Sequence, residues 1–304
     1  MRLQINILTI MSKNFCIIII SHGRPNDIYT LATLQRAGCT IPIYILIDDQ
    51  DSKMDEYLSK YHKMVFVFDK IKYANMVDQY DNFNNLRTTT HARNACFDLA
   101  KELGYKYFLV LDDDYTGFSL RIDNKLQHPD VVRTVNQNID NLFLMTLDYY
   151  KNSTFTSICY SQGGDWFGGG NAFNLAPKRK AMNSFFCSID RRFYFVSRLN
   201  EDVNTYMTLG NIGHVFMTIP FVQLNQKTTQ KTAGGMTEAY KANGTYVKSF
   251  YTVIARPDCT KINLMGRTNS RLHHNIKWGH AVPCIISEKY KKGDNQEIQS
   301  RKDI

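Results

Sequence analysis

The segment YFLVLDDD, residues 107–114, limits the possible folds of this 304-residue chain more than any other segment. Its apolar, mostly strand-favouring residues are typical of a central strand that is buried on both faces. The run ends in Asp112, Asp113 and Asp114, three adjacent carboxylates that repel one another unless a cation lies among them. Mg²⁺ and Mn²⁺ prefer oxygen ligands and leave coordination sites open for substrate phosphates. The segment therefore predicts a metal–diphosphate site at the carboxyl end of a strand in an α/β sheet, with a solvated acidic turn as the alternative.

Strand-like and helix-like segments alternate through the first half of the chain. Strands are expected at 15–20, 42–47, 64–68 and 107–111, and helices at 27–37, 52–61 and 90–103. This alternation predicts an α/β fold with a mostly parallel sheet flanked by helices. The second half is basic and less regular. There we expect a helix at 130–142, a strand at 143–147, a glycine-rich loop at 163–170 and a helix at 199–209.

The formal net charge of +9 is placed unevenly, with many lysines and arginines in the second half of the chain. This distribution favours a polyanionic partner such as nucleic acid, although ordinary solubility charge is the alternative. No apolar stretch reaches the roughly 18 residues that a membrane span needs, so no membrane association is expected. The seven cysteines are scattered singly without a CxxC pair, which indicates reduced thiols in a cytoplasmic protein.

The order of several short motifs resembles the GT-A fold of nucleotide-diphosphosugar glycosyltransferases over roughly residues 14–210. The motifs are Ser21-His22-Gly23-Arg24-Pro25, Asp48-Asp49, Arg93-Asn94-Ala95, Asp112-Asp113-Asp114 and Glu201-Asp202. Two phrases, GGDWFGGGNAF and RLNEDVNTY, are similar to the DNA-base glycosyltransferases associated with TET/JBP-type enzymes, including base-J-type and phage relatives. The resemblance implies one catalytic domain at 14–290, with a nucleotide-sugar half at 14–150 and an acceptor half at 151–290. An N-terminal extension at 1–13 and a flexible tail at 291–304 flank it.

The resemblance implies a metal site built on the aspartate segment. Asp112 and Asp114 would hold Mn²⁺ or Mg²⁺, and Asp113 would touch the ribose or the sugar. His274 could complete the metal shell, with a structural histidine as the alternative. Arg93 would lie near the diphosphate or the sugar, unless it is a helix-surface arginine.

The resemblance also implies contacts to the rest of a UDP-sugar donor. Ser21 and Arg24 follow the first strand, where the uridine and the phosphates would lie. Asp48 would accept a hydrogen bond from uracil, with a turn residue as the alternative. Asp165 and Trp166 would line the donor sugar or stack on the acceptor, although a core tryptophan is equally compatible with the sequence.

The Glu201-Asp202 pair matches the catalytic acids of the family. The narrower resemblance implies inverting transfer, in which one carboxylate deprotonates the attacking hydroxyl directly. We expect Asp202 to be this base and Glu201 to orient the acceptor. The alternative is a pair of acids that stabilises a helix N-terminus.

The expected function is metal-dependent transfer of a sugar, glucose favoured, from a UDP-sugar to the hydroxyl of a 5-hydroxymethyl pyrimidine in DNA, with hydroxymethyluracil favoured. Such an enzyme would work in the cytoplasm, the host's if the gene belongs to a phage. Candidate contacts to DNA phosphates are Lys227, Lys231, Arg256 and Arg267. Two alternatives stay open: a protein or polysaccharide acceptor, and a catalytically inactive nucleic-acid-binding module.

Overall fold

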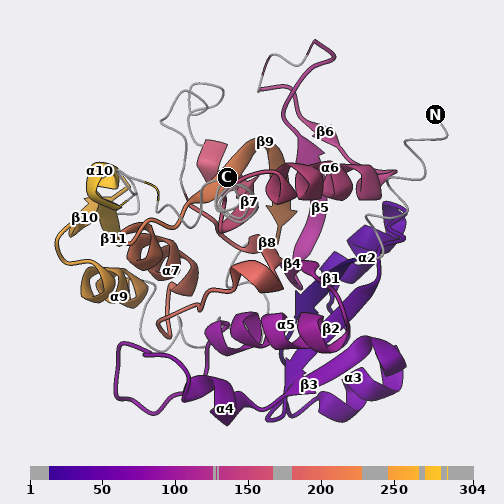
Figure 1. Cartoon of the computed structure of the whole chain (residues 1–304), viewed down its shortest axis with the longest axis horizontal. Helices are drawn as coiled ribbons and strands as arrows, with labels where there is room; N and C mark the ends of the chain where they lie inside the picture. The colour runs from indigo at the N-terminus through magenta and orange to yellow at the C-terminus, as the bar shows by residue number, and fades with distance from the viewer. Residues whose placement is uncertain are drawn as a thin grey trace, which may run out of the picture.

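A computed structural model describes residues 14–125, 128, 130–166, 180–227, 246–266, 271–281 and 286. Within these residues, nine strands form one sheet in the order β3-β2-β1-β4-β8-β7-β9-β5-β6, and helices lie against it (Figure 1). The predicted α/β class, a sheet flanked by helices, is confirmed. The N-terminal extension and the C-terminal tail that the sequence predicts lie outside the described residues, and the division into two halves stays a prediction.

The first half of the chain forms the parallel part of the sheet, as predicted. Its strands are β1 (Phe15–Ile20), β2 (Ile43–Asp48), β3 (Val65–Phe68) and β4 (Tyr107–Asp112), paired β3-β2-β1-β4. The connecting helices are α2 (Tyr29–Arg36), α3 (Met54–Tyr61), η1 (His62–Met64), α4 (Lys70–Ala74) and α5 (Thr90–Glu102). All of β1 is buried, because successive side chains enter opposite cores. Ile17 and Ile19 pack in one core with α2 and α6, while Cys16 and Ile18 pack in the other with α5 and α7.

The second half adds antiparallel pairings to the sheet. Its strands are β5 (Tyr115–Leu120), β6 (Arg133–Thr134), β7 (Ser157–Gln162), β8 (Ser184–Ser188) and β9 (Phe216–Gln226). β8 pairs antiparallel with β4, and β9 pairs parallel with β7 and antiparallel with β5. Two short 3₁₀ helices, η2 (Gly163–Trp166) and η4 (Ile189–Arg191), follow β7 and β8.

The predicted strand at 143–147 and most of the predicted helix at 130–142 are wrong. Residues 143–147 lie inside helix α6 (Ile139–Lys151), and β6 occupies part of the expected helix. The buried residues Phe143, Leu144, Leu147 and Tyr150 recur at helical spacing and pack against the sheet. A short apolar run is compatible with either element, and here the helical face continues past its end.

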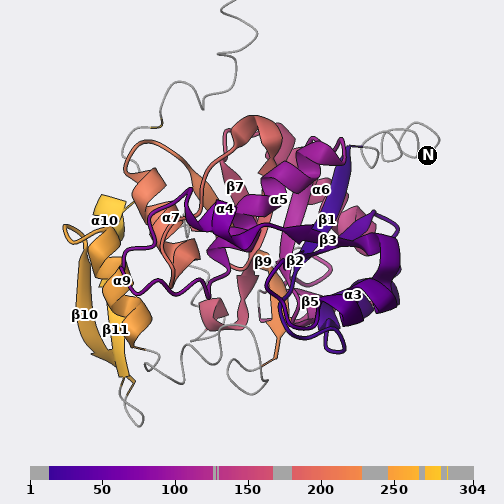
Figure 2. The same cartoon turned by 90° about the horizontal axis from the view of Figure 1, so that it is seen from below.

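The C-terminal elements form a lobe beside the main sheet. Helix α7 (Glu201–Gly210) is followed after β9 by α9 (Val247–Ala255), β10 (Thr260–Met265), β11 (Arg271–Ile276) and α10 (Trp278–Ala281). β10 and β11 make a separate antiparallel pair, which lies at the edge of the molecule next to α9 (Figures 1 and 2). Within the described residues, no helix combines the length and the apolar character that crossing a membrane requires.

Candidate active site

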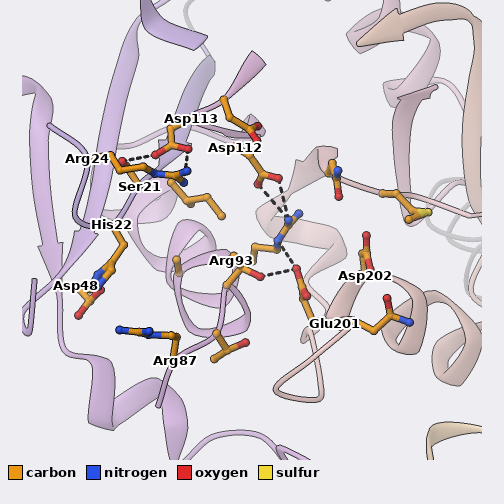
Figure 3. A pocket seen from close by; sticks show the side chains of 18 of the residues that line it. Ser21, His22, Arg24, Asp48, Arg87, Arg93, Asp112, Asp113, Glu201 and Asp202 are labelled. Atoms are coloured by element: carbon orange, nitrogen blue, oxygen red, sulfur yellow. Dashed lines mark hydrogen bonds and ion pairs between the residues drawn. The ribbon is translucent and has the colours of Figure 1, made fainter. Parts of the chain in front are cut away.

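A cavity of about 340 Å³ opens where the carboxyl ends of the parallel strands meet the start of α7. The register pairs Ile20 of β1 with Asp112 of β4, so the residues that follow both strands emerge side by side. Figure 3 shows the result, with residues at the carboxyl ends of β1, β2 and β4 on one wall and Glu201 and Asp202 on the other. The cavity lining includes most of the predicted site residues, namely Ser21, Arg24, Asp48, Arg93, Asp112, Asp113, Asp114, Glu201 and Asp202.

Asp113 is held by residues that follow β1. Ser21 Oγ donates a hydrogen bond to Asp113 Oδ2 at 2.6 Å, and Arg24 Nη2 lies 2.6 Å from Oδ1. The Tyr57 hydroxyl supports both partners, at 2.7 Å from Ser21 Oγ and 2.8 Å from the Arg24 amide nitrogen. Asp113 is only 1% exposed. The structure thus joins three predicted donor-binding residues to one another, and in this arrangement Asp113 fixes Ser21 and Arg24 in the cavity wall.

Arg93 connects the two walls of the cavity. Its Nη2 donates to Asp112 Oδ1 at 3.1 Å, and its Nε lies 3.1 Å from Glu201 Oε1 (Figure 3). Arg93 is 2% exposed, and its guanidinium lies 4.8 Å from the ring centroid of Phe185. Thr89 Oγ1, at the start of the same helix, donates to Glu201 Oε1 at 2.5 Å. The alternative of a helix-surface arginine is therefore wrong, because Arg93 is a buried bridge between the aspartate segment and the acidic pair.

The aspartate segment carries negative charge that the described residues do not fully balance. Burial raises the pKa of Asp112 to about 7 and that of Asp113 and Asp114 to about 6, although nearby arginines oppose the shift. Among the described residues, Asp114 Oδ1 is buried without a hydrogen-bond partner. Oxygen donors with raised pKa values fit a hard divalent cation, which Asp112 and Asp114 would hold. In the part of the chain that the structure describes, no three His, Cys, Asp or Glu side chains form a ready cation cage. The remaining ligands would then come from substrate phosphates and water.

His274 is not placed with Asp112 and Asp114. It lies on β11, outside the cavity lining, and its Nδ1 is 3.4 Å from both Asn200 Nδ2 and Thr252 Oγ1. Burial lowers the pKa of His274 to about 3, which keeps the imidazole neutral. Its predicted role as a metal ligand does not fit this position. The histidine instead packs behind Asn200, which does line the cavity.

The acidic pair opens helix α7 on the far wall. Asn200 precedes it in a left-handed conformation with φ of +60°, and Asp202 Oδ1 accepts a hydrogen bond from the Val203 amide at 2.7 Å. Burial raises the pKa of Asp202 to about 6, with Glu201 adding to the shift and Arg93 opposing it. Glu201 is held by Arg93, whereas Asp202 faces the cavity. This difference matches an orienting role for Glu201 and a proton-accepting role for Asp202.

The structure adds a lysine to this wall that the sequence reasoning missed. Lys248 of α9 lines the cavity, and burial lowers its pKa although Asp202 and Glu201 favour the charged form. Its sequence context, a lysine in a basic half of the chain, gave no signal that separated it from surface lysines. The packing of α9 against α7 brings it into the site.

Asp48 lies at the opposite end of the cavity, as the last residue of β2. His22 Nδ1 is 2.7 Å from Asp48 Oδ2, and Lys70 Nζ is 3.1 Å from Oδ1. Burial alone would raise the pKa of Asp48, but its bond to His22 and the charge of Lys70 hold it at about 2. Lys70 and Arg87 also line this end and were not predicted. Lys70 could have been predicted as a site residue, because it lies two residues after a predicted strand.

Asp165 and Trp166 do not line the cavity, which corrects their predicted role at the donor sugar or acceptor. Asp165 Oδ1 forms an ion pair with Lys180 Nζ at 2.7 Å, and its Oδ2 accepts from the Gln162 amide at 3.0 Å. Trp166 is buried, donates through Nε1 to Ser161 Oγ at 3.1 Å, and stacks under the Arg121 guanidinium. The core tryptophan alternative is the one that the structure supports.

The four candidate DNA contacts are placed differently from one another. Arg256 is buried, and its guanidinium binds Asp258 and the carbonyl oxygens of Met207 and His280, so it does not fit a contact to DNA phosphate. Lys227 lies over the ring of Tyr29, with Nζ 3.4 Å from the centroid. Lys231 and Arg267 lie outside the described residues.

The solved structures with a similar fold resemble this chain only distantly. Glucosyl-3-phosphoglycerate synthase from Mycobacterium tuberculosis, in complex with Mg²⁺ and UDP, is 9% identical with a TM-score of 0.47, covering 90% of this chain and 91% of that one. Its complex with Mn²⁺, UDP-glucose and phosphoglyceric acid has a TM-score of 0.44 at 9% identity, covering 93% and 91%. A cytidylyltransferase from Leptospira borgpetersenii serovar Hardjo-bovis has a TM-score of 0.35 at 14% identity, covering 68% and 76%. No curated protein matches the sequence significantly.

The sequence itself matches a family model over most of its length. The profile of the TET-Associated Glycosyltransferase family matches residues 15–235, which include β1, the aspartate segment, Arg93 and the acidic pair. This agrees with the predicted GT-A glycosyltransferase and with the narrower resemblance to TET/JBP-associated enzymes. The chain belongs to the TET-associated glycosyltransferase family.

Proposed function

We propose that this glycosyltransferase moves a sugar, glucose favoured, from a UDP-sugar to the hydroxyl of a 5-hydroxymethyl pyrimidine in DNA, with hydroxymethyluracil favoured. The observation that carries the proposal is a cavity in which the Asp112–Asp114 segment faces Glu201 and Asp202. A sugar transferase needs a cation-binding group for the departing diphosphate and a base for the incoming hydroxyl. These two groups must lie near each other, and Arg93 pairs at 3.1 Å with both Asp112 of one wall and Glu201 of the other.

The donor would lie along the carboxyl ends of the parallel strands. Asp112 and Asp114 are the residues that would hold Mn²⁺ or Mg²⁺, and Asp113 would keep Ser21 and Arg24 in place beside the phosphates. When bound, the cation supplies Lewis-acid stabilisation of the negative charge that develops on the diphosphate. Asp48, with its partners His22 and Lys70, lies at the end of the cavity that suits the nucleobase.

The acceptor would enter from the side of α7. Asp202 takes the proton from the hydroxymethyl oxygen as that oxygen bonds to the anomeric carbon, and the bond to the diphosphate breaks on the opposite side. The sugar is thereby joined to the base with inversion, and UDP leaves. Glu201 cannot easily serve as this base because Arg93 and Thr89 hold its carboxylate.

Two observations favour DNA as the acceptor. The matching family is described as TET-associated, and the sequence resemblance implies a hydroxymethyl pyrimidine in DNA as its acceptor. The chain also carries a formal charge of +9, and the lobe formed by α9, β10 and β11 is rich in cations. An uncharged acceptor would need neither feature.

The test is transfer of labelled glucose from UDP-glucose, with Mn²⁺, to a duplex that contains 5-hydroxymethyluracil. Unmodified duplex, an Asp112→Ala/Asp114→Ala variant and an Asp98→Asn control run alongside. Asp98 lies on α5 and pairs with Arg192, outside the cavity lining. Label on modified DNA only, lost in the double variant and kept in the control, supports the proposal.

Other outcomes separate the alternatives. Metal-dependent UDP release without label on DNA refutes the DNA acceptor and favours a protein or polysaccharide. Neither transfer nor UDP release, across several nucleotide sugars, favours a catalytically inactive nucleic-acid-binding module.

A further inference from the structure

The antiparallel pair of β10 and β11 has two chemically different faces. Register pairs Lys261 with Asn275, Asn263 with His273, and Met265 with Arg271, so these six side chains share one face, here called the ribbon face. The alternate residues share the other face, where His274 lies against Asn200 of the α7 start and Thr252 of α9. The ribbon face therefore points away from α7 and α9.

The ribbon face combines cations with amides and lacks carboxylates. Lys261, Asn263, Arg271 and Asn275 are all exposed. From Glu238 to Glu288 the sequence places seven lysines and arginines between the two glutamates, with Asp258 as its sole acid. Asp258 is bound by Arg256 on the C-terminal side of α9. Lys248 lies near Asp202 and Glu201, so Lys261 and Arg271 are the exposed cations that the ribbon face offers to an external anion.

The two strands that carry the ribbon face border the acceptor side of the cavity with their opposite face. His274, on the opposite face of β11, contacts Asn200, and Asn200 lines the cavity beside Glu201 and Asp202. Helix α9 packs against both strands and contributes Lys248 to the same wall. Figure 2 shows the pair of strands flanking α9 at the edge of the molecule. A polyanion on the ribbon face would therefore lie on the outer side of the two strands that border the acceptor wall.

We propose that the ribbon face is the surface that grips duplex DNA beside the modified base. This rests on the proposed function, and it assigns the contact to β10 and β11, which follow the family match at 15–235. A six-residue strand spans roughly 20 Å, or about six base pairs, and a two-stranded ribbon fits the major groove. Lysine and arginine bind phosphates, while asparagine and arginine bind base edges. Because phosphates and base edges together suit this combination of cations and amides, we assign the ribbon face to nucleic acid.

The experiment compares two double variants that remove the same charge. Lys261→Gln/Arg271→Gln changes the ribbon face, and Lys63→Gln/Lys101→Gln changes exposed lysines near the amino ends of the strands. Binding of a fluorescent duplex with one 5-hydroxymethyluracil is followed by anisotropy across a salt series. Losing two phosphate contacts should lower the slope of log affinity against log salt by about 1.8 and weaken binding at least about tenfold near 0.1 M salt. The control should bind like the unchanged protein, and Lys261→Arg/Arg271→Lys should restore binding.

The proposal is overturned if the ribbon variant binds duplex with the affinity and salt slope of the control. It is also overturned if that variant keeps its duplex affinity but loses affinity for heparin, which would assign the face to a polysaccharide. The transfer assay distinguishes this failure from that of the proposed function. If the protein binds duplex through the ribbon face but transfers no sugar, the proposed function alone is refuted. If the ribbon variant transfers sugar to duplex as well as the unchanged protein does, the proposed surface alone is refuted.

Discussion

Replacing Arg93 with methionine tests whether its charge holds the two walls of the site together. Arg93 pairs with Asp112 and Glu201 at 3.1 Å each while almost fully buried. Removing one partner of a buried ion pair costs about 3–5 kcal/mol, because the other partner is left as an uncompensated charge. Methionine keeps a soft contact with Phe185, so lost packing adds little. We expect Arg93→Met to lose about 3–5 kcal/mol of unfolding free energy at pH 8.5.

The pH dependence of this loss identifies its cause. Burial already raises the pKa of Asp112 to about 7, and without Arg93 it should rise further. A carboxyl whose pKa is raised by folding destabilises the fold when it is ionised, and protonation relieves that penalty as pH falls. The share of the loss due to Asp112 is therefore present above pH 8 and absent below about pH 7. One unit of additional shift corresponds to about 1.4 kcal/mol, so the loss should shrink by at least that amount at pH 5.5.

The assay is urea unfolding at pH 8.5 and 5.5, in EDTA and without donor. Arg192→Met is the matched control. Arg192 pairs with Asp98, which lies on the same helix as Arg93, but both of these side chains are partly exposed. Such a pair contributes about 0–1 kcal/mol. Its bond to Arg192 lowers the pKa of Asp98, which therefore stays ionised at both pH values. A loss for Arg93→Met that is equal at the two pH values, or no larger than the control's, would refute the charge argument.

Four further predictions concern individual carboxylates and the tryptophan. Asp202→Asn should reduce kcat about 10²–10⁴-fold while UDP-sugar affinity stays within twofold, as initial rates and calorimetry would show. In the unchanged enzyme, kcat/KM should fall as pH drops below about 6, where Asp202 becomes protonated; an acidic limb near pH 4 would contradict the assignment. Asp114→Asn should raise the melting temperature in EDTA, because it removes a buried charge, yet abolish the stabilisation by Mn²⁺ with UDP; a lower melting temperature in EDTA would contradict this. Trp166→Phe should leave sugar transfer unchanged and Trp166→Ala should cost about 3–5 kcal/mol of stability, whereas lost transfer in the phenylalanine variant would return Trp166 to the site.

The parts of the fold that the sequence could predict are those governed by local patterns. β4 and its aspartates were found because a buried parallel strand reads as a continuous apolar run, and ligands collect where such strands end. Helix α6 was divided wrongly because the apolar residues around Phe143 fit both a strand and a helix. Its burial against the sheet, a tertiary effect, decides for the helix.

The candidate site was predictable where its residues follow strands and unpredictable where distant packing supplies them. Ser21, Arg24 and Asp48 were identified from their positions after β1 and within β2. Lys248 belongs to α9 and reaches the cavity because that helix packs on α7, a contact that no local spacing encodes. Trp166 was misassigned because its glycine-rich sequence context suggested a ligand-binding loop. In the structure its indole instead donates a hydrogen bond inside the protein.

The charge of the cavity explains why a cation and a diphosphate should bind this site together. Among the described residues at the acidic end, five carboxylates face three cations: Asp112, Asp113, Asp114, Glu201 and Asp202 against Arg24, Arg93 and Lys248. A diphosphate alone would add negative charge to this surplus, which electrostatics disfavours in a buried site. A divalent cation alone would balance the surplus but lack most of its oxygen ligands, since no described group of three side chains is placed to hold it. Each ligand therefore supplies what the other needs. Burial raises the pKa values of Asp112 and Asp114, and a bound cation would favour their ionised forms.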